Sequence, residues 1–515
     1  MRLYTLIAIL LLISSLTCAT FAVDTTKSAP PNIVLILVDD LGYGDVGCYG
    51  ATKVKTPNID KLASEGRRFL DAHSASAVCS PSRYALLTGS YPFRKNMWGP
   101  LMNPDPLAIA PNQKTIASVL KQQGYVTSCF GKWHLGFGDK MNPDWNLDLK
   151  PGPLETGFDY YFGLPVVNSH PPFVWIENHR VLGLDGNDPL VYGGVPPTRQ
   201  IREKMMKPAI SGGKQAHDLY KDELVGTTLS ERACAWMRSN KDKSFFLYFA
   251  TPHIHHPFTP HPRFNGTSEA GVYGDFIHEL DWMVGEVQRT LTELHLNDNT
   301  LIILTSDNGG MINLGGQEAV ALGHRLNGDL LGFKFDAWEG GHRVPFIARW
   351  PGKIPSGSVS NQLICHVDLL ASLAALSGAT LTTADGPDSM DVLPAILGIT
   401  DLPIREQLII SPQKKTHLAI RQNQWLYISA QGGGGFTGNK VGDHALGGPA
   451  ALKYAGENNS DVKDGNFIKG APAAQLYDLI ADPRQQQNVI REHPEVAAKL
   501  QTLLSESQAK ARTAP

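Results

Sequence analysis

Four short apolar segments of this 515-residue chain each end abruptly in polar or charged residues. The first, Asn32–Val38, is rich in β-branched residues and does not alternate, as expected for a strand buried on both faces. The others are residues 126–130, 245–249 and 300–304, and helical patterns at 218–238 and 273–294 lie between several of them. Strands that alternate with helices predict an α/β fold with a mostly parallel sheet covered by helices on both faces.

The chain divides into three predicted parts. Residues 1–22 have one arginine, an apolar core and small residues at the end, which predicts a secretory signal peptide and an exported protein, periplasmic or secreted. Residues 30–400 form the predicted α/β domain. Residues 401–515 contain strand-like runs at 408–410, 425–428 and 476–479 and a terminal helical pattern, which predict a smaller α+β subdomain with an antiparallel sheet. No later apolar run reaches the roughly twenty residues that a membrane span needs.

Charge and cysteine content exclude several classes of protein. The 46 basic residues nearly balance the 49 acidic ones, so the composition gives no sign of a nucleic-acid-binding surface. An anionic substrate would have to meet a local cluster of basic groups. Six cysteines are too few for a disulfide scaffold, and we expect buried free thiols at the positions that have no other role, Cys48, Cys129, Cys234 and Cys365.

Acidic and amide side chains follow two of the predicted strands. Asp39 and Asp40 come directly after the first strand, and Asp307 and Asn308 come shortly after the fourth. In parallel sheets, ligands bind beyond the carboxyl ends of the strands, so these residues are expected to meet. Oxygen donors without His or Cys favour Ca²⁺ or Mg²⁺ over Zn²⁺. The alternative interpretation is that these acids cap helices or lie in solvated turns.

The segment Cys79-Ser80-Pro81-Ser82-Arg83 precedes an apolar helical run. Ser80 is expected as the N-cap and Pro81 as the first helical residue. Residue 79 would then lie at a helix N-terminus, where free N–H groups and the helix dipole favour an anion. A buried structural cysteine beside a helix cap is the alternative.

The same segment, continued to Gly89, resembles the signature of the type I sulfatases. Three further motifs support the resemblance: Gly131-Lys132-Trp133-His134, the pair His255 and Pro257, and residues 332–334 ahead of 339–345. The resemblance implies an alkaline phosphatase-like fold. It also implies that a formylglycine-generating enzyme oxidises Cys79 to formylglycine, whose hydrated aldehyde is the nucleophile.

The resemblance further implies a ligand set and a catalytic set. One Ca²⁺ per chain would be held by Asp39, Asp40, Cys79, Asp307 and Asn308. The positions that match the family's catalytic residues are Cys79, Arg83, Lys132, His134, His255 and Lys334. His255, with Lys334, would protonate the leaving oxygen, and His134 would help to release sulfate by deprotonating the second hydroxyl of the hydrated aldehyde. His253 and His256 receive no role.

The implied activity is hydrolysis of a sulfated carbohydrate or an aryl sulfate. A phosphate or phosphonate ester hydrolase of the same fold and a non-catalytic glycan-binding protein are the alternatives. Residues 264–275 resemble sulfatases that act on N-acetylgalactosamine 6-sulfate. Arg325, shortly before Lys334, is a candidate to bind a uronate or a second sulfate, or to form a structural ion pair.

Overall fold

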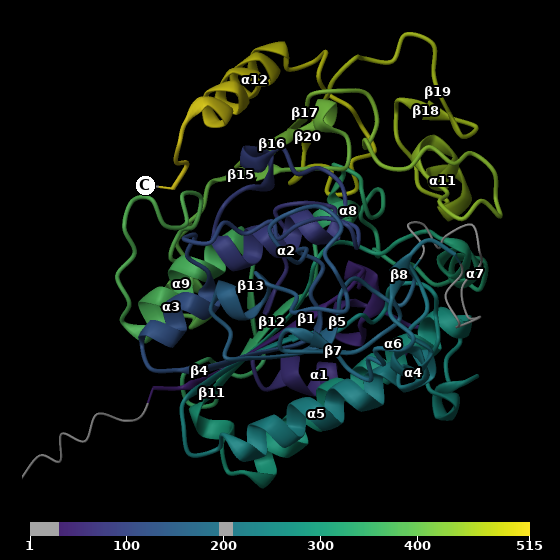
Figure 1. Cartoon of the computed structure of the whole chain (residues 1–515). Helices are drawn as coiled ribbons and strands as arrows, with labels where there is room; N and C mark the ends of the chain where they lie inside the picture. The colour runs from purple at the N-terminus through teal and green to yellow at the C-terminus, as the bar shows by residue number, and fades with distance from the viewer. Residues whose placement is uncertain (1–29, 195–209, 515) are drawn as a thin grey trace, which may run out of the picture.

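The computed structural model describes residues 30–194 and 210–514, and a ten-stranded sheet forms its centre (Figure 1). Five neighbouring strands run parallel: β11 (Thr300–Ser306), β1 (Asn32–Val38), β10 (Phe245–Ala250), β4 (Val126–Lys132) and β5 (Tyr160–Leu164). Shorter strands extend both edges: β12 (Phe346–Arg349), β2 (Arg67–Phe69) and β13 (Ser358–Ser360) beside β11, and β6 (Ile176–Glu177) and β7 (Arg180–Val181) beside β5. The predicted α/β fold with a mostly parallel sheet is confirmed.

Alternate side chains of β1 enter the two layers that cover the sheet. Ile33, Leu35 and Leu37 pack against one layer, and the intervening Val34 and Ile36 pack against the other. Helices α2 (Cys79–Thr88), α3 (Ile116–Gln122) and α9 (Leu369–Ser377) form the first layer; α1 (Pro57–Ser64), α5 (Val225–Ser239) and α6 (Gly271–Glu293) form the second (Figure 1). Burial on both faces explains why this strand has a continuous apolar sequence.

One predicted helix is divided in the structure. The pattern at residues 218–238 starts at the last residue of α4 (Lys214–Asp218) and then covers a short 3₁₀ turn at Asp222–Leu224 and α5. The backbone of Lys221 is extended, with φ −132° and ψ 120°, so the helix cannot run through it. The pattern at 273–294 corresponds to α6 with only small shifts at its ends.

A separate antiparallel sheet lies near the C-terminus (Figure 1). Its strands are β15 (Gln407–Ile410), β16 (Ala419–Gln422), β17 (Trp425–Ile428) and β20 (Gln475–Asp478), and the terminal helix α12 (Pro494–Ala509) packs on it. This sheet confirms the expected C-terminal α+β element. The domain limits at residues 400 and 401 remain a prediction.

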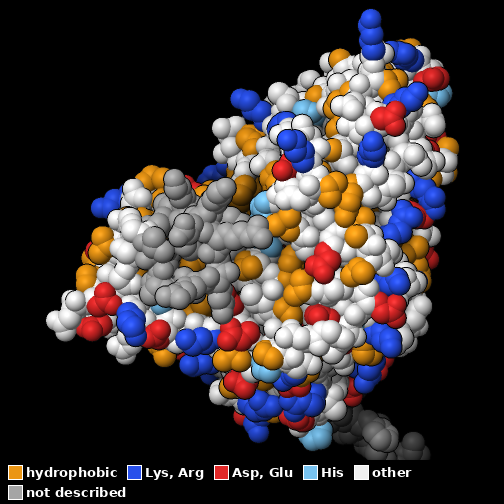
Figure 2. All heavy atoms as spheres, turned by 90° about the vertical axis from the view of Figure 1, so that its right-hand side faces the viewer, with side chains coloured by type: hydrophobic (Ala, Val, Ile, Leu, Met, Phe, Trp, Pro, Cys, Tyr) orange, Lys and Arg blue, Asp and Glu red, His pale blue; other side chains and the backbone are white. Residues whose placement is uncertain are grey.

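The remaining elements are short. They are β3 (Ala72–His73), β8 (Val191–Tyr192), β9 (Ile210–Ser211), α7 (Leu314–Ala321), α8 (Glu339–His342), β14 (Ile364–Cys365), α10 (Leu393–Ile396), α11 (Gly448–Ala455), β18 (Val462–Lys463) and β19 (Asn466–Phe467). All five described cysteines are free thiols, and four of them are buried; the expectation was wrong only in that Cys48 is partly exposed. None of the described helices has the length and apolar character to cross a membrane. On the face shown in Figure 2, basic, acidic and apolar side chains are interspersed.

A buried ion pair joins the C-terminal sheet to the layer that contains α9. Arg405, just before β15, donates to both carboxylate oxygens of Asp368 at 2.8 and 2.5 Å, and it also donates to Tyr91 Oη. Removing one partner of a buried pair leaves an uncompensated charge and typically costs about 3–5 kcal/mol. We expect Arg405→Ala to lower the free energy of unfolding, measured in urea, by about 3–5 kcal/mol. The matched variant Arg325→Ala breaks an exposed pair with Asp329 and should cost less than about 1 kcal/mol. Equal shifts for the two variants would show that the Arg405 pair does not hold the subdomain in place.

Candidate active site

The carboxyl ends of four adjacent parallel strands deliver the predicted site residues to one edge of the sheet. Asp39 follows β1, Asp307 follows β11, Lys132 is the last residue of β4, and His255 follows β10. The backbone holds these strand ends together: Asp39 N–H donates to His253 O at 2.7 Å. The sheet order therefore brings together residues that are more than 250 positions apart in the sequence.

Three carboxylates and one amide form the centre of this edge. Oxygen atoms of Asp39, Asp40 and Asp307 lie within 4.8 Å of one another, and Asn308 Nδ2 donates to Asp40 Oδ1 at 2.8 Å. All four side chains are buried. Three of their oxygen atoms, Asp39 Oδ1, Asp40 Oδ2 and Asn308 Oδ1, have no hydrogen-bond partner among the described residues. Buried oxygens without donors, in an all-oxygen set, fit a hard divalent cation.

Each carboxylate also contacts at least one buried cation. Arg83 Nε donates to Asp307 Oδ2 at 2.9 Å, Lys132 Nζ to Asp39 Oδ2 at 2.7 Å, and Lys334 Nζ to Asp40 Oδ1 at 2.5 Å. The three positive and three negative charges balance, so a bound divalent cation would leave the site positive and attractive to an anionic substrate. Burial disfavours the charged form of Lys334, but Asp40 and the neighbouring acids outweigh burial and raise the pKa of its ammonium above the usual value.

Cys79 is the first residue of α2 and is only 2% exposed. The prediction that Ser80 caps this helix is wrong: Val78 is the N-cap, with extended backbone, and Ser80 Oγ instead accepts from Leu101 N–H at 2.9 Å. Pro81 is therefore the third helical residue, which the first turn tolerates because its N–H groups have no intrahelical acceptor. Burial raises the pKa of the Cys79 thiol, against the opposing effects of Lys132 and Lys334. The unmodified side chain is thus a neutral thiol at neutral pH and a weak nucleophile.

The histidines differ in where their rings point. His255 Nδ1 donates to His256 O at 2.6 Å, and its Nε2 lies 3.8 Å from Asp40 Oδ2. Burial, His256 and Lys334 lower the pKa of His255 well below its usual value, so the ring is neutral and Nε2 carries a lone pair. His134, with φ +56°, donates from Nε2 to Leu101 O at 2.7 Å. His253 instead packs against Phe276 of α6, with centroids 4.2 Å apart.

A cavity of about 260 Å³ opens beside Cys79. His134, His255 and Lys334 line it, as the sequence predicts for a shared site. Sequence reasoning assigned no role to the other lining residues, which include five with polar or aromatic side chains: His170, His256, Gln413, Phe436 and His444. Three of these come from the C-terminal part of the chain, and the only signal near them was the unusual run of glycines at 432–435.

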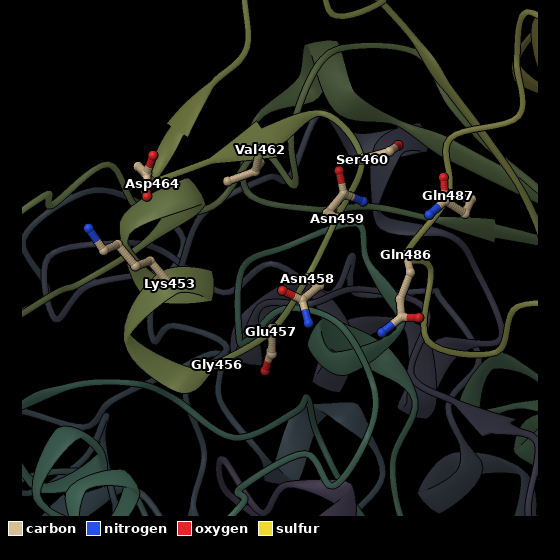
Figure 3. Close-up of a pocket in the computed structure, with 11 residues that line it drawn as sticks. Lys453, Gly456, Glu457, Asn458, Asn459, Ser460, Val462, Asp464, Gln486 and Gln487 are labelled. Atoms are coloured by element: carbon tan, nitrogen blue, oxygen red, sulfur yellow. The ribbon is translucent and has the colours of Figure 1, made fainter.

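Two of the other cavities lie away from this centre. One, of about 480 Å³, is walled by Lys453 of α11, by the segment after that helix and by Gln486 and Gln487 opposite, and contains none of the predicted site residues (Figure 3). Arg325 lines the other, together with Tyr43 and Asp329. Arg325 pairs with Asp329 at 3.1 Å, as one of the two interpretations expects, and it does not line the cavity beside Cys79; a binding role elsewhere stays a prediction.

The fold and this edge of the sheet define an α/β enzyme whose polar site lies at the carboxyl ends of parallel strands. The sulfatase family model matches residues 31–379. The chain is 39% identical over 504 residues to an N-acetylgalactosamine-6-O-sulfatase of Bacteroides thetaiotaomicron, covering 93% of each chain. It is 34% identical to the steryl-sulfatase of Rattus norvegicus, over 72% of this chain and 70% of that one.

A solved structure described in connection with the metabolism of multiple glycosaminoglycans by Bacteroides thetaiotaomicron has a TM-score of 0.81 and 36% identity, covering 94% of this chain and 100% of that chain. The chain therefore belongs to the sulfatase family, and it is an enzyme that hydrolyses sulfate esters.

Proposed function

We propose that this protein removes sulfate from a sulfated carbohydrate, with Cys79 oxidised to formylglycine and one Ca²⁺ bound beside it. The observation that carries the proposal is the buried group of Asp39, Asp40, Asp307 and Asn308, with three oxygens free of donors, next to residue 79. The relative that acts on N-acetylgalactosamine 6-sulfate makes a 6-sulfated N-acetylhexosamine the first substrate to test. Aryl sulfates are a second class.

The proposed cation is held by Asp39, Asp40, Asp307 and Asn308, with residue 79 completing the set. When bound, it would supply positive charge to the sulfuryl oxygens and to the nucleophile. The hydrated aldehyde at residue 79 would supply one hydroxyl to attack sulfur and a second whose deprotonation releases sulfate. Lys132 and Lys334 add charge stabilisation from the protein, and Arg83 orients Asp307 by its hydrogen bonds.

Proton transfer is assigned to His255, Lys334 and His134. The ammonium of Lys334 keeps its proton because Asp40 lies 2.5 Å away. His255 Nε2 is neutral until an anionic sulfate ester raises its pKa, and it then donates to the leaving oxygen together with Lys334. His134 Nδ1 has no hydrogen-bond partner among the described residues, so it is free to accept the proton from the second hydroxyl.

The two alternative functions, an esterase for phosphate or phosphonate and a non-catalytic glycan-binding protein, would require different features of the site. A phosphate or phosphonate ester hydrolase of the same fold would need the site to prefer a phosphoryl group, whereas a sulfatase relative at 39% identity extends over 93% of the chain. A non-catalytic glycan-binding protein would not need His134, His255 and Lys334 around residue 79. Hydrolysis rates on matched sulfate and phosphate esters separate the three.

We also propose export and maturation by a formylglycine-generating enzyme. The predicted signal peptide at 1–22 lies outside the described residues. N-terminal sequencing of protein from the exported fraction tests the first proposal, and it should find a chain that begins after residue 22.

His255→Ala should slow hydrolysis of a sulfated sugar far more than hydrolysis of 4-nitrophenyl sulfate. A sugar alkoxide needs a proton as it leaves, whereas a nitrophenoxide is stable without one, and general acid catalysis contributes about 10²–10⁴-fold. Steady-state kcat on the two substrates measures the difference. Equal losses on both would assign His255 to binding or to the metal site and leave Lys334 as the acid.

A further inference from the structure

We propose that His256, His444 and Phe436 form the binding site for the sugar ring that carries the sulfate, and that this ring is uncharged. The proposal rests on the proposed sulfatase function and names its substrate class. All three residues line the cavity beside Cys79. Phe436 and His444 come from the segment between β17 and α11, and His256 follows β10.

The charges around the cavity argue against an acidic sugar. Among the described lining residues, Lys334 is the only lysine, and arginine, aspartate and glutamate are absent. Lys334 is already paired with Asp40. Among the described lining residues, a carboxylate or a second sulfate on the ring would find no cation of its own, and burying an unpaired charge is costly. The cavity volume of about 260 Å³ lies below the roughly 300–1,000 Å³ of pockets for drug-sized ligands, and suits a single ring.

The imidazoles supply the hydrogen-bonding groups that such a ring needs. His256 is 9% exposed, and its Nδ1 has no hydrogen-bond partner among the described residues. Its ring lies 4.6 Å from that of His444 and 4.2 Å from that of His255, centroid to centroid. Burial, His444 and Lys334 lower the pKa of His256 well below its usual value. A neutral imidazole both donates and accepts, which matches sugar hydroxyls, and a hydroxyl bound to Nδ1 would satisfy a buried atom that otherwise lacks a partner.

Phe436 gives the cavity an apolar wall against which the ring's C–H face can pack. Its ring lies 4.1 Å from that of Phe335, centroid to centroid. The glycine-rich segment before it is fixed to Asp336: Gly435 N–H donates to Asp336 Oδ1 at 3.1 Å, and Ala337 N–H donates to Gly433 O at 2.6 Å. A Cβ at either of these glycines would lie 2.4 Å from Asp336 Oδ1. Only glycine allows this close approach, so the segment places Phe436 at a defined position.

Gln317 of α7 positions the turn that carries His444. Its Nε2 donates to Asp443 O at 2.8 Å, and its Oε1 accepts from Gly442 N–H at 2.8 Å. Gln317 is buried and does not line the cavity. It acts on the substrate only through His444, as a positioning residue.

The first test compares kcat/KM of the matured enzyme on N-acetylgalactosamine 6-sulfate and on 4-nitrophenyl sulfate. For His444→Ala we expect the loss on the sugar, mainly through KM, to exceed the loss on the aryl ester by at least roughly 10-fold. Gln317→Ala should also lose more kcat/KM on the sugar than on the aryl ester, but by a smaller factor. The conservative Gln317→Glu keeps the acceptor and loses the donor, so its loss on the sugar should lie between those of Gln317→Ala and wild type. The control His493→Ala changes a histidine at the start of α12, outside the cavity, and should leave both rates unchanged. Equal losses on both substrates for His444→Ala would overturn the proposal.

The second test needs no variant. Wild-type enzyme is offered three uncharged monosaccharide sulfates (N-acetylgalactosamine 6-sulfate, galactose 6-sulfate and galactose 4-sulfate) and a uronic acid 2-sulfate. We expect at least one uncharged sugar to be cleaved with a kcat/KM about 100-fold or more above that of the uronate. Comparable rates, or cleavage of 4-nitrophenyl sulfate without any uncharged sugar, would overturn the ring site and leave the sulfatase function intact. Failure on every sulfate ester would instead overturn the proposed function.

Discussion

Cys79→Ala should reduce turnover of every sulfate ester by roughly 10⁴-fold or more, because it removes the proposed nucleophile itself. The fold should survive the change. The thiol packs in a small apolar cluster with Val78, Met311 and Phe335, and alanine leaves only a small gap there. Initial rates together with thermal unfolding measure both effects. Cys234→Ala, which alters another buried thiol on α5, is the matched control and should keep full activity.

Peptide mass spectrometry tests directly whether residue 79 is modified. Protein from a host that contains the maturation enzyme should show an aldehyde or its hydrate at residue 79 and no thiol there. Fully active enzyme with an unmodified thiol at residue 79 would contradict the proposed nucleophile, whatever the variant shows.

Removal of the cation should have the second large effect. Dialysis against a chelator should abolish activity, and Ca²⁺ should restore it, because metal assistance contributes several kcal/mol, or about 10³-fold or more in rate. Asp40→Asn should lower both the bound calcium and the activity, because it removes one charge from the ligand set and the partner of Lys334. Elemental analysis of purified protein should find one calcium per chain.

Asp281→Asn is the matched control for the metal. Asp281 is also a buried acid, but it accepts from the backbone of Asn58 and Ile59 at the start of α1. This variant should keep its calcium. Active enzyme with stoichiometric zinc and neither calcium nor magnesium would overturn the assignment of the cation.

The parts of the fold that follow from local sequence pattern could be predicted. The apolar runs at 32–38 and 300–304 have the composition of strands buried on both faces, and the alternation with helices fixed the class of sheet. Because ligands bind beyond the carboxyl ends of parallel strands, Asp39 and Asp307 could be predicted to lie close together without any knowledge of the packing. Helix boundaries were less accurate: Lys221 and Val78 have extended backbones, which local pattern did not indicate.

The wall of the cavity could not be predicted in the same way. Phe436 and His444 lie in a segment without periodicity, and their position depends on contacts with Asp336 and Gln317 that are about 100 residues or more away in the sequence. His256 stood in a run of histidines whose members point in different directions. Composition cannot separate them, since His253 faces α6 while His256 faces the cavity.

The burial of Cys79 bears on when the proposed oxidation can take place relative to folding. In the folded protein this side chain is 2% exposed, and an enzyme that oxidises it would have to bring the sulfur into its own active site. Residues 79–88 leave the ribosome well before β10, β11 and the segment around Phe436, which complete the site much later in synthesis. With the proposed oxidation of Cys79, oxidation and folding would compete in time, and a chain that folded first would stay in the unoxidised, inactive form. The specific activity of a preparation would then depend on the rate of synthesis as well as on the fraction of chains that fold correctly.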